Sequence, residues 1–376
     1  MKTSDRATAR LDWIRSTLGD DSLTLAPASA DASFRSYWRT RHAGQSWILM
    51  DSPPALEDPA PWLAIGKKLA AAGLHVPAVH AVDPARGFVL IEDLGSQLYL
   101  PALNDASVDA LYGDAMEALL RMQTAVDASD LAPYDAAFLR RELELMPEWF
   151  LGHHLGCTLD GDVRAEIEAA FALILESALE QPRCFVHRDF HSRNLLIVDS
   201  PGGRSPLAGD ASDDSERASP ASGLLRMEGQ MPRKRGASWI ANPGIIDFQG
   251  ALRGPIAYDL ASLLRDCYIV WPRERVEGWV DDFRLRLRSA GLLDADIDRV
   301  RFLRWFDLIG LQRHIKVLGI FCRLWYRDGK RGYLDDLPRV HAYVIDVARG
   351  YPELAALVAL LERCVGGRDL ALPVAA

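Results

Sequence analysis

Residues 185–197 read FVHRDFHSRNLLI, a polar loop between two short apolar segments. The loop fits the pattern H-R-D-x-x-x-x-N of protein kinases, with Asn194 following Asp189 at the spacing that the pattern requires. A carboxylate on such a loop orients or accepts the proton of an attacking hydroxyl, and the amide oxygen holds Mg²⁺ against phosphates. The stretch therefore predicts a protein-kinase-like fold, with Asp189 as catalytic base and Asn194 as a metal ligand.

A second segment supplies another carboxylate. Residues 244–250 read GIIDFQG, an apolar strand that ends in Asp247 at the place of the metal aspartate of D-F-G. Phosphoryl transfer depends on positioning and charge neutralisation more than on covalent help from the protein. A divalent cation held by Asn194 and Asp247, beside Asp189, would supply the positioning and the charge neutralisation. The alternative, in which the two aspartates only cap turns, is disfavoured because both segments match the kinase template.

The periodicity of apolar residues predicts an α+β fold with two lobes. Strand-like segments and two helices alternate in the first 94 residues, which predicts a small antiparallel sheet, and helical patterns dominate from residue 106. We therefore expect an N-terminal lobe at 1–94 and a helical lobe at 95–376. The predicted strands are 23–27, 34–40, 47–50, 80–83 and 88–92, with further strands within 184–198 and 244–248. The predicted helices are 6–19, 61–73, 106–126, 162–180, 274–290 and 299–326.

Composition narrows the class of protein. The net charge of −9 over 376 residues disfavours a protein that binds nucleic-acid backbones. No apolar run has the length of about 20 residues that spans a bilayer, and the N-terminus lacks the apolar core of a secretory signal. The five cysteines are scattered, as reduced thiols are in cytosolic proteins. We expect a cytoplasmic protein without a membrane, nucleic-acid or obligate protein partner.

Residues 199–243 differ from the rest of the chain. Ser, Gly, Pro, Asp and Arg dominate them, so they cannot bury enough apolar surface to offset the entropy of ordering. We predict a disordered or loosely ordered insertion in the helical lobe. A tolerated loop is the simpler interpretation, and binding of an anion or a partner by its PRKRG segment is the alternative.

The two motifs together resemble the aminoglycoside phosphotransferase and choline kinase superfamily. Residues 189–194, DFHSRN, fit its D-x-H-x-x-N loop, and GPIAYDLA at 254–261 fits the helix start that follows its metal strand. The resemblance implies a protein-kinase-like fold with ATP and Mg²⁺ bound between the lobes. It also implies that His187, His191 and Asp259 brace the catalytic loop rather than react, and a structural role is the favoured interpretation of His191.

The same resemblance assigns nucleotide contacts to the N-terminal lobe. The turn that ends at Ser33, with Phe34 and Arg35, would cover the ATP phosphates, although it lacks the usual glycines. The backbone around Glu92 and Leu94 would hydrogen-bond adenine as a hinge. From the residues alone, this segment is equally well interpreted as an ordinary buried strand followed by a loop.

One position departs from the kinase pattern. Met50 stands where the third strand of kinases carries a phosphate-binding lysine, and the helix at 61–73 offers no glutamate to pair with a lysine. A cation must come from elsewhere, and Arg35 and Arg39 are the nearest candidates. A pseudokinase without turnover is the alternative, which the intact Asp189, Asn194 and Asp247 disfavour.

Longer segments resemble the bacterial N-acetylmuramate/N-acetylglucosamine anomeric kinases. They are ILMDSPP at 48–54, FVLIEDLG at 88–95, RELELMPEWFLGHHLG at 141–156 and residues 310–340. That family also lacks the third-strand lysine. The resemblance implies ATP-dependent phosphorylation of the C1 hydroxyl of both free sugars in peptidoglycan recycling.

Binding of such a substrate requires particular side chains in the helical lobe. N-acetylmuramate carries a lactyl carboxylate, so we expect a cation from the face of Arg313 and Lys316, with His314 beside it. Glu148 could hydrogen-bond sugar hydroxyls, and Trp149 could stack on the ring. For each residue, surface charge or core packing is the alternative. A pocket for an aminoglycoside should be lined by carboxylates, and a pocket for choline needs an aromatic cage. Aromatic side chains also stack on sugar rings, so they do not discriminate between these substrates. Another small hydroxyl substrate therefore stays open.

Overall fold

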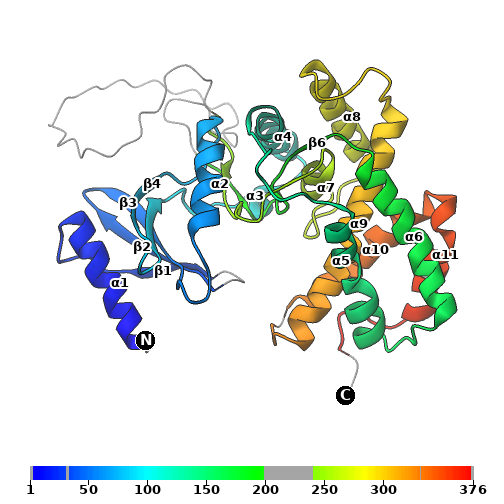
Figure 1. Ribbon diagram of the computed structural model, residues 1–376, viewed down its shortest axis with the longest axis horizontal. Helices are drawn as coiled ribbons and strands as arrows, with labels where there is room; N and C mark the ends of the chain where they lie inside the picture. The colour runs from blue at the N-terminus through cyan, green and yellow to red at the C-terminus, as the bar shows by residue number, and fades with distance from the viewer. Residues whose placement is uncertain (1–2, 31–33, 199–239, 331, 374–376) are drawn as a thin grey trace. The chain divides into compact units, whose positions relative to one another are not determined.

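A computed structural model describes residues 3–30, 34–198, 240–330 and 332–373 of the chain (Figure 1). The chain forms two compact units, which are described separately. The first unit comprises Met1–Ala118 and Arg193–Gln249, and the second comprises Leu119–Ser192 and Gly250–Ala376. Except for its last four residues, the predicted insertion at 199–243 lies outside the described residues.

The first unit is built on a five-stranded antiparallel sheet in the order β1-β2-β3-β5-β4. Its strands are β1 Ala26–Ala30, β2 Ser36–His42, β3 Gln45–Asp51, β4 Val79–Asp83 and β5 Phe88–Glu92. Four of the five agree with the sequence prediction to within about two residues. The first was predicted too early, because Leu23 belongs to a hydrophobic cluster but precedes the strand. Met50 lies opposite Tyr37 and Val89 and is fully buried.

Helix α1, Thr3–Leu18, docks on this sheet through charge and apolar contact. Asp51, at the end of β3, is 1% exposed and accepts hydrogen bonds from Arg6 and Arg10. The Arg10 guanidinium also lies 4.0 Å from the centroid of the Trp38 ring, which is a cation–π contact. Trp13 and Ile14 of the helix belong to the hydrophobic cluster under the sheet. The helix is therefore held at its polar and its apolar side.

Other elements of the first unit connect the sheet to the segment that leads to Asp247. Helix α2, Ala60–Ala71, ends just before Gly73, whose φ of 83° suits glycine at a helix end. The antiparallel pair of β7, Leu195–Leu196, and β8, Gly244–Ile245, is joined to the segment between α2 and β4 by a hydrogen bond from Ile245 N–H to the His75 carbonyl. Helix α3, Tyr99–Ala102, follows β5, and α4, Val108–Ala125, carries the chain into the second unit.

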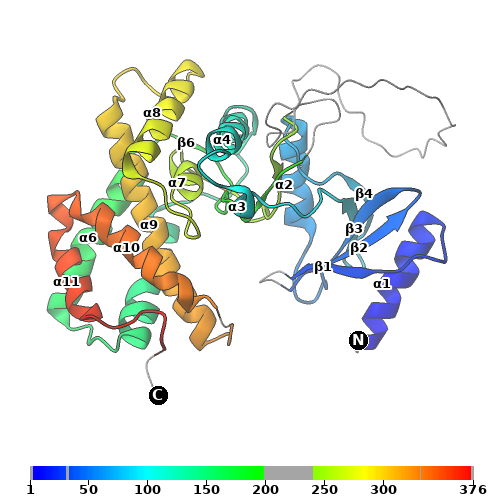
Figure 2. The same cartoon turned by 180° about the vertical axis from the view of Figure 1, so that it is seen from behind.

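The second unit is helical and is centred on α9, Arg299–Tyr326. Figure 2 shows α10 crossing α9, with α6 and α11 beside them. A two-stranded sheet pairs β6, Arg183–Val186, with β9, Leu252–Pro255, and β9 was not predicted from the sequence. The other helices are α5 Ala136–Leu143, the π-helix η1 Met146–His154, α6 Gly161–Leu179, α7 Tyr258–Leu264, α8 Arg273–Ser289, α10 Leu337–Arg349 and α11 Ala355–Val365, with short 3-10 turns at Leu334–Asp336 and Pro352–Leu354.

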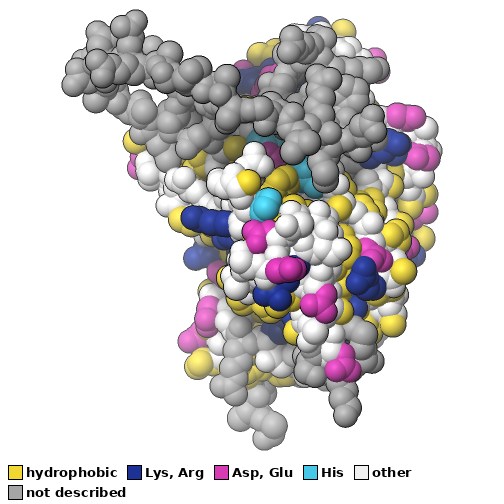
Figure 3. Space-filling view, turned by 90° about the vertical axis from the view of Figure 1, so that its left-hand side faces the viewer, with side chains coloured by type: hydrophobic (Ala, Val, Ile, Leu, Met, Phe, Trp, Pro, Cys, Tyr) yellow, Lys and Arg dark blue, Asp and Glu magenta, His cyan; other side chains and the backbone are white. Residues whose placement is uncertain are grey.

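Local sequence explains where the helices of this unit begin. Asp135, Asp160 and Asp298 precede α5, α6 and α9, and each side chain accepts a hydrogen bond from a backbone N–H of the first turn. Such N-caps satisfy donors that the helix leaves unpaired. None of the helices in the described part of the chain is long and apolar enough to cross a membrane. On the side of the first unit seen in Figure 3, acidic, basic and hydrophobic side chains are intermixed.

Candidate active site

The first half of the catalytic loop belongs to the second unit and is held by Asp259. Asp259, at the start of α7, is fully buried and accepts the backbone N–H groups of His187 (2.6 Å) and Arg188 (3.0 Å). Burial raises the pKa of Asp259 to about 7, although these two hydrogen bonds oppose the rise. Arg188 has a φ of 78°, a strained conformation for a residue with a side chain. The two bonds fix the backbone directly before Asp189, where the resemblance had implied a brace.

Asp189 is a partly buried carboxylate among cations. Burial alone would raise its pKa, but the charges of Lys316, His191, Arg313 and Arg188 outweigh burial and hold the pKa below its usual range. The carboxylate is therefore ionised at neutral pH. An ionised carboxylate on a fixed loop can accept the proton of a hydroxyl as that hydroxyl attacks phosphorus.

Glu142 of α5 organises the cations next to this carboxylate. It lies 2.9 Å from Lys316 Nζ and 2.7 Å from an Nη atom of Arg188, and it accepts hydrogen bonds from Gln312 and Tyr134. Burial raises its pKa, but Lys316 and Arg188 lower it more, so Glu142 is ionised as well. Sequence analysis missed this residue, because its segment was noted only for its resemblance to the amino-sugar kinases.

The second half of the loop is held by Asp266. This buried carboxylate accepts the backbone N–H of Ser192 at 3.0 Å and also the Ser192 hydroxyl. His191 packs edge-on against Tyr268, with ring centroids 5.8 Å apart. His187 is fully buried and packs edge-on against Phe190. Asp266 was also missed, since no motif marks it.

Asn194 and Asp247 meet at one end of the β7–β8 pair in the first unit. The Asn194 carbonyl accepts the N–H of Ile246, so the two candidate metal ligands leave adjacent strands. Asp247 has a φ of 64°, and its Oδ1 accepts Gln249 Nε2 at 2.7 Å. Phe248 anchors the turn by packing on Trp62, with ring centroids 5.1 Å apart. An amide and a carboxylate oxygen are donors that Mg²⁺ prefers, so these residues fit the ion.

A buried arginine lies beside Asp247, the candidate metal ligand. Arg35 is 6% exposed, and its guanidinium lies 3.2 Å from Glu57 and 3.4 Å from Asp247 Oδ1. Arg39, the other candidate cation, is bound to both carboxylate oxygens of Asp93. Phe34 is 65% exposed, and Ser33 lies outside the described residues. Arg35 and Glu57 thus form a cation–carboxylate pair in the unit whose third strand lacks a lysine.

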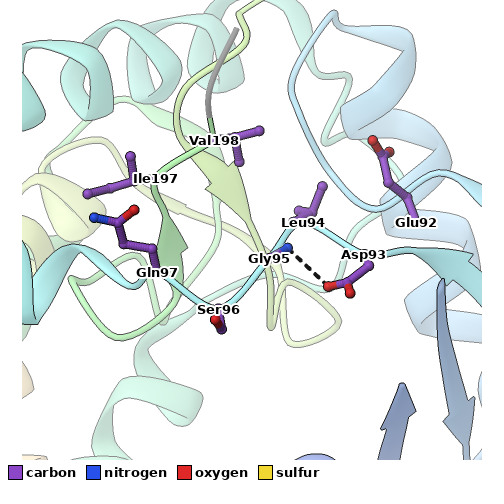
Figure 4. A pocket seen from close by; sticks show the side chains of 8 residues that line it. All are labelled: Glu92, Asp93, Leu94, Gly95, Ser96, Gln97, Ile197 and Val198. Atoms are coloured by element: carbon purple, nitrogen blue, oxygen red, sulfur yellow. Dashed lines mark hydrogen bonds between the residues drawn. The ribbon is translucent and has the colours of Figure 1, made fainter. Parts of the chain in front are cut away.

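The predicted hinge lines a pocket of about 350 Å³, within the size range of small-ligand sites (Figure 4). Glu92 is fixed by its N–H to the Ala78 carbonyl and by the Ala78 N–H to its own carboxylate. Figure 4 shows the Asp93 carboxylate bound to the Gly95 N–H. The pocket therefore combines apolar side chains with fixed polar groups, and its lining residues are Glu92, Asp93, Leu94, Gly95, Ser96, Gln97, Ile197 and Val198.

The predicted substrate residues lie in different surroundings. Glu148 is exposed on η1, and Trp149 stacks on His153 at 4.7 Å between ring centroids. Arg313 is 5% exposed and donates to Cys267 Sγ at 3.2 Å. His314 is fully buried, forms a hydrogen bond from Nε2 to the Arg265 carbonyl and stacks on Tyr343.

These surroundings favour core packing, the alternative interpretation, for His314. Burial lowers its pKa to about 3, and the charge of Arg313 adds to this effect, so the ring is neutral. A neutral ring enclosed in the helix core contributes no charge toward an acidic substrate. The spacing had placed His314 beside two cations, but a one-residue step along a helix turns the side chain to another face.

Comparison with known proteins extends these observations. The model of the phosphotransferase enzyme family matches residues 24–204. The N-acetylmuramate/N-acetylglucosamine kinase of Pseudomonas putida is 40% identical over 345 residues, which cover 92% of this chain and 89% of that protein. The kinase of the same name from Pseudomonas aeruginosa is 39% identical over 346 residues, covering 92% and 90%. The solved ethanolamine kinase of Plasmodium vivax aligns with 92% of this chain and 89% of its own, with a TM-score of 0.59 and 11% identity. The predicted α+β, protein-kinase-like fold is thereby confirmed.

Proposed function

Because the chain belongs to the family of the N-acetylmuramate/N-acetylglucosamine kinases, we propose that it uses ATP to phosphorylate the C1 hydroxyl of both sugars. The single observation that carries the proposal is identity of about 40% over nine-tenths of the chain. The reaction would serve peptidoglycan recycling in the cytoplasm. The phosphotransferase activity itself follows from the family.

The surroundings of Asp189 support its role as the base. An anomeric hydroxyl is more acidic than an ordinary alcohol, so a carboxylate of low pKa suffices to accept its proton. The charges of Lys316, Arg313 and Arg188, with a contribution from His191, keep Asp189 ionised, and Asp259 and Asp266 fix the loop on both sides of it. The proton passes from the C1 hydroxyl to a carboxylate oxygen of Asp189 as the sugar oxygen bonds to the γ-phosphorus of ATP and ADP leaves.

The first unit supplies the nucleotide contacts in this proposal. The hinge at Glu92 and Leu94 receives adenine, and Ser33 and Phe34 belong to the turn over the phosphates. Asn194 and Asp247 hold Mg²⁺, which neutralises phosphate charge when it is bound. We assign the phosphate-binding cation to Arg35, because its guanidinium lies 3.4 Å from Asp247, the proposed metal ligand, whereas Arg39 is bound to Asp93. The lobe boundary near residue 94, directly after the hinge strand β5, belongs to the same proposal.

The test is ³¹P NMR of the protein with Mg-ATP and each sugar, beside the Asp189→Asn variant. We expect the resonance of a sugar 1-phosphate with the wild-type protein and none with the variant. A resonance at another position of the sugar would overturn the regiochemistry. If ATP stays intact with both sugars, the substrate assignment is wrong, and amino alcohols and aminoglycosides are tried next. Binding of Mg-ATP without transfer to any acceptor would identify a pseudokinase.

A further inference from the structure

Among the described residues, no carboxylate forms an ion pair with the buried Arg313, although the charges of Asp266 and Asp189 favour its charged form. Its guanidinium donates one hydrogen bond, to the thiol of Cys267, and a thiol is a weak acceptor. Arg265 and Lys316, which are buried in the same unit, pair with Asp307 and Glu142 at 2.6 and 2.9 Å. Most of the five N–H donors of the Arg313 guanidinium therefore have no protein acceptor among the described residues, which leaves them available to a ligand.

Two chains of contacts place Arg313 next to the catalytic loop. Its partner Cys267 directly follows Asp266, which binds Ser192 of the loop. One turn further along α9, Lys316 pairs with Glu142. Glu142 in turn pairs with Arg188, the residue before Asp189. The charges of Arg313 and Asp189 also shift the pKa of each other's group, as expected for neighbours.

We propose that Arg313 binds the lactyl carboxylate of N-acetylmuramate and thereby sets the selectivity between the two sugars. The proposal rests on the proposed function. A guanidinium presents two parallel N–H groups that match a carboxylate, and burial strengthens such a charge-assisted pair. N-acetylglucosamine lacks the lactyl group, so it leaves Arg313 without this partner. Lys316 is not the better candidate, because its Nζ already lies 2.9 Å from the Glu142 carboxylate.

The test compares kcat/KM for the two sugars in the wild-type protein and in Arg313→Gln. We expect the ratio of N-acetylmuramate to N-acetylglucosamine to fall about 50-fold in the variant, the size of a lost buried charge pair. A second probe is N-acetylmuramate whose carboxylate is converted to an amide. The wild-type protein should prefer the acid to the amide by a similar factor, and Arg313→Gln should not discriminate.

Lys316→Met is the matched control, since it removes a neighbouring cation that already has a partner. It should lower kcat/KM for both sugars by the same factor. An unchanged ratio in Arg313→Gln would overturn the proposal and indicate that Arg313 acts on ATP or on Asp189. If Arg313→Gln does not fold, the proposal is tested by the same kcat/KM ratio in Arg313→Lys. The preference of the wild-type protein for the acid over the amide tests it as well. Phosphorylation of neither sugar by the wild-type protein would instead contradict the proposed function.

Discussion

The carboxylate of Asp189 differs from a surface carboxylate in the balance of charges around it. Lys316, His191, Arg313 and Arg188 outweigh the effect of burial on its pKa. Replacing Asp189 by Asn removes the proton acceptor but keeps the shape of the side chain. We expect kcat to fall about 1000-fold, within the range for loss of a general base, with the Kd for ATP unchanged. Steady-state kinetics measure kcat, and nucleotide titration measures the Kd for ATP. Turnover near the wild-type value would contradict the assignment of Asp189 as the base.

Arg35 offers a second test at the level of one side chain. It pairs with Glu57 and lies beside Asp247, so a bound phosphate would meet its charge. We expect Arg35→Gln to raise the KM for ATP about tenfold, consistent with the loss of one charged hydrogen bond, and to leave the KM for the sugar unchanged. Arg41→Gln, which removes an exposed arginine of the same strand, is the control. An equal change of both KM values would show that Arg35 only stabilises the fold.

Sequence patterns predict site residues whose spacing along the chain forms a motif, but not the residues that folding brings to the loop. Asp189, Asn194 and Asp247 were predicted because loop and strand fix their spacing along the chain. Glu142 and Asp266 reach the catalytic loop from distant helical segments. No local pattern distinguishes such carboxylates from ordinary surface charges, so only the folded chain identifies them.

At the level of elements, periodicity predicted most of the long helices to within two residues, although α1 begins at Thr3, three residues before the predicted start. The predicted 162–180 and 299–326 correspond to Gly161–Leu179 and Arg299–Tyr326. A long amphipathic pattern and an Asp N-cap define such boundaries well. The four-residue β9 was missed, because a segment that short is too brief to show an alternation. Its pairing with β6 is set by contacts between parts of the chain that are far apart in sequence.

Helix α9 owes part of its packing to Gly319. A Cβ at this position would lie 2.2 Å from the carbonyl carbon of Leu145, which precedes η1. We expect Gly319→Ala to destabilise the protein by about 3 kcal/mol, the upper range for overpacking, since backbone must move. Gly310→Ala on the same helix is the matched control, because its Cβ would meet Ala261 at an ordinary 3.6 Å. The control should be neutral or gain up to about 1 kcal/mol from helix propensity. Urea unfolding measures both, and equal stabilities of the two variants would contradict the steric argument.

At the level of the whole molecule, each of the two compact units is built from two separate stretches of the chain. Residues 193–249 belong to the first unit, although the chain has already entered the second at residue 119. The hydrogen bond from Ile245 to His75 and the pairing of β7 with β8 explain why the segment that leads to Asp247 joins the first unit. The pattern of apolar residues predicted a change from strands to helices near residue 94, but such long-range pairing leaves no local signal in the sequence.

The stability of the whole protein should depend on pH through His314. Burial lowers its folded-state pKa to about 3, below the usual 6.5, so the ring stays neutral in the fold while an unfolded chain takes up a proton. The stabilisation from this group is therefore complete above pH 6.5 and is lost as the pH falls toward 3. Each pH unit between these two pKa values corresponds to about 1.36 kcal/mol of unfolding free energy. Between pH 7 and pH 5, we therefore expect wild type to lose about 2 kcal/mol more than His314→Gln.

The free energy of urea unfolding at the two pH values measures this difference. Other buried histidines, such as His154 and His341, are present in both proteins, so their contributions cancel in the comparison. His153→Gln replaces an exposed histidine and should keep the pH dependence of the wild-type protein. Gln can still donate to the Arg265 carbonyl, so His314→Gln tests the proton rather than the hydrogen bond. An equal loss in wild type and variant would mean that His314 is protonated in the folded protein, with its charge compensated by the core.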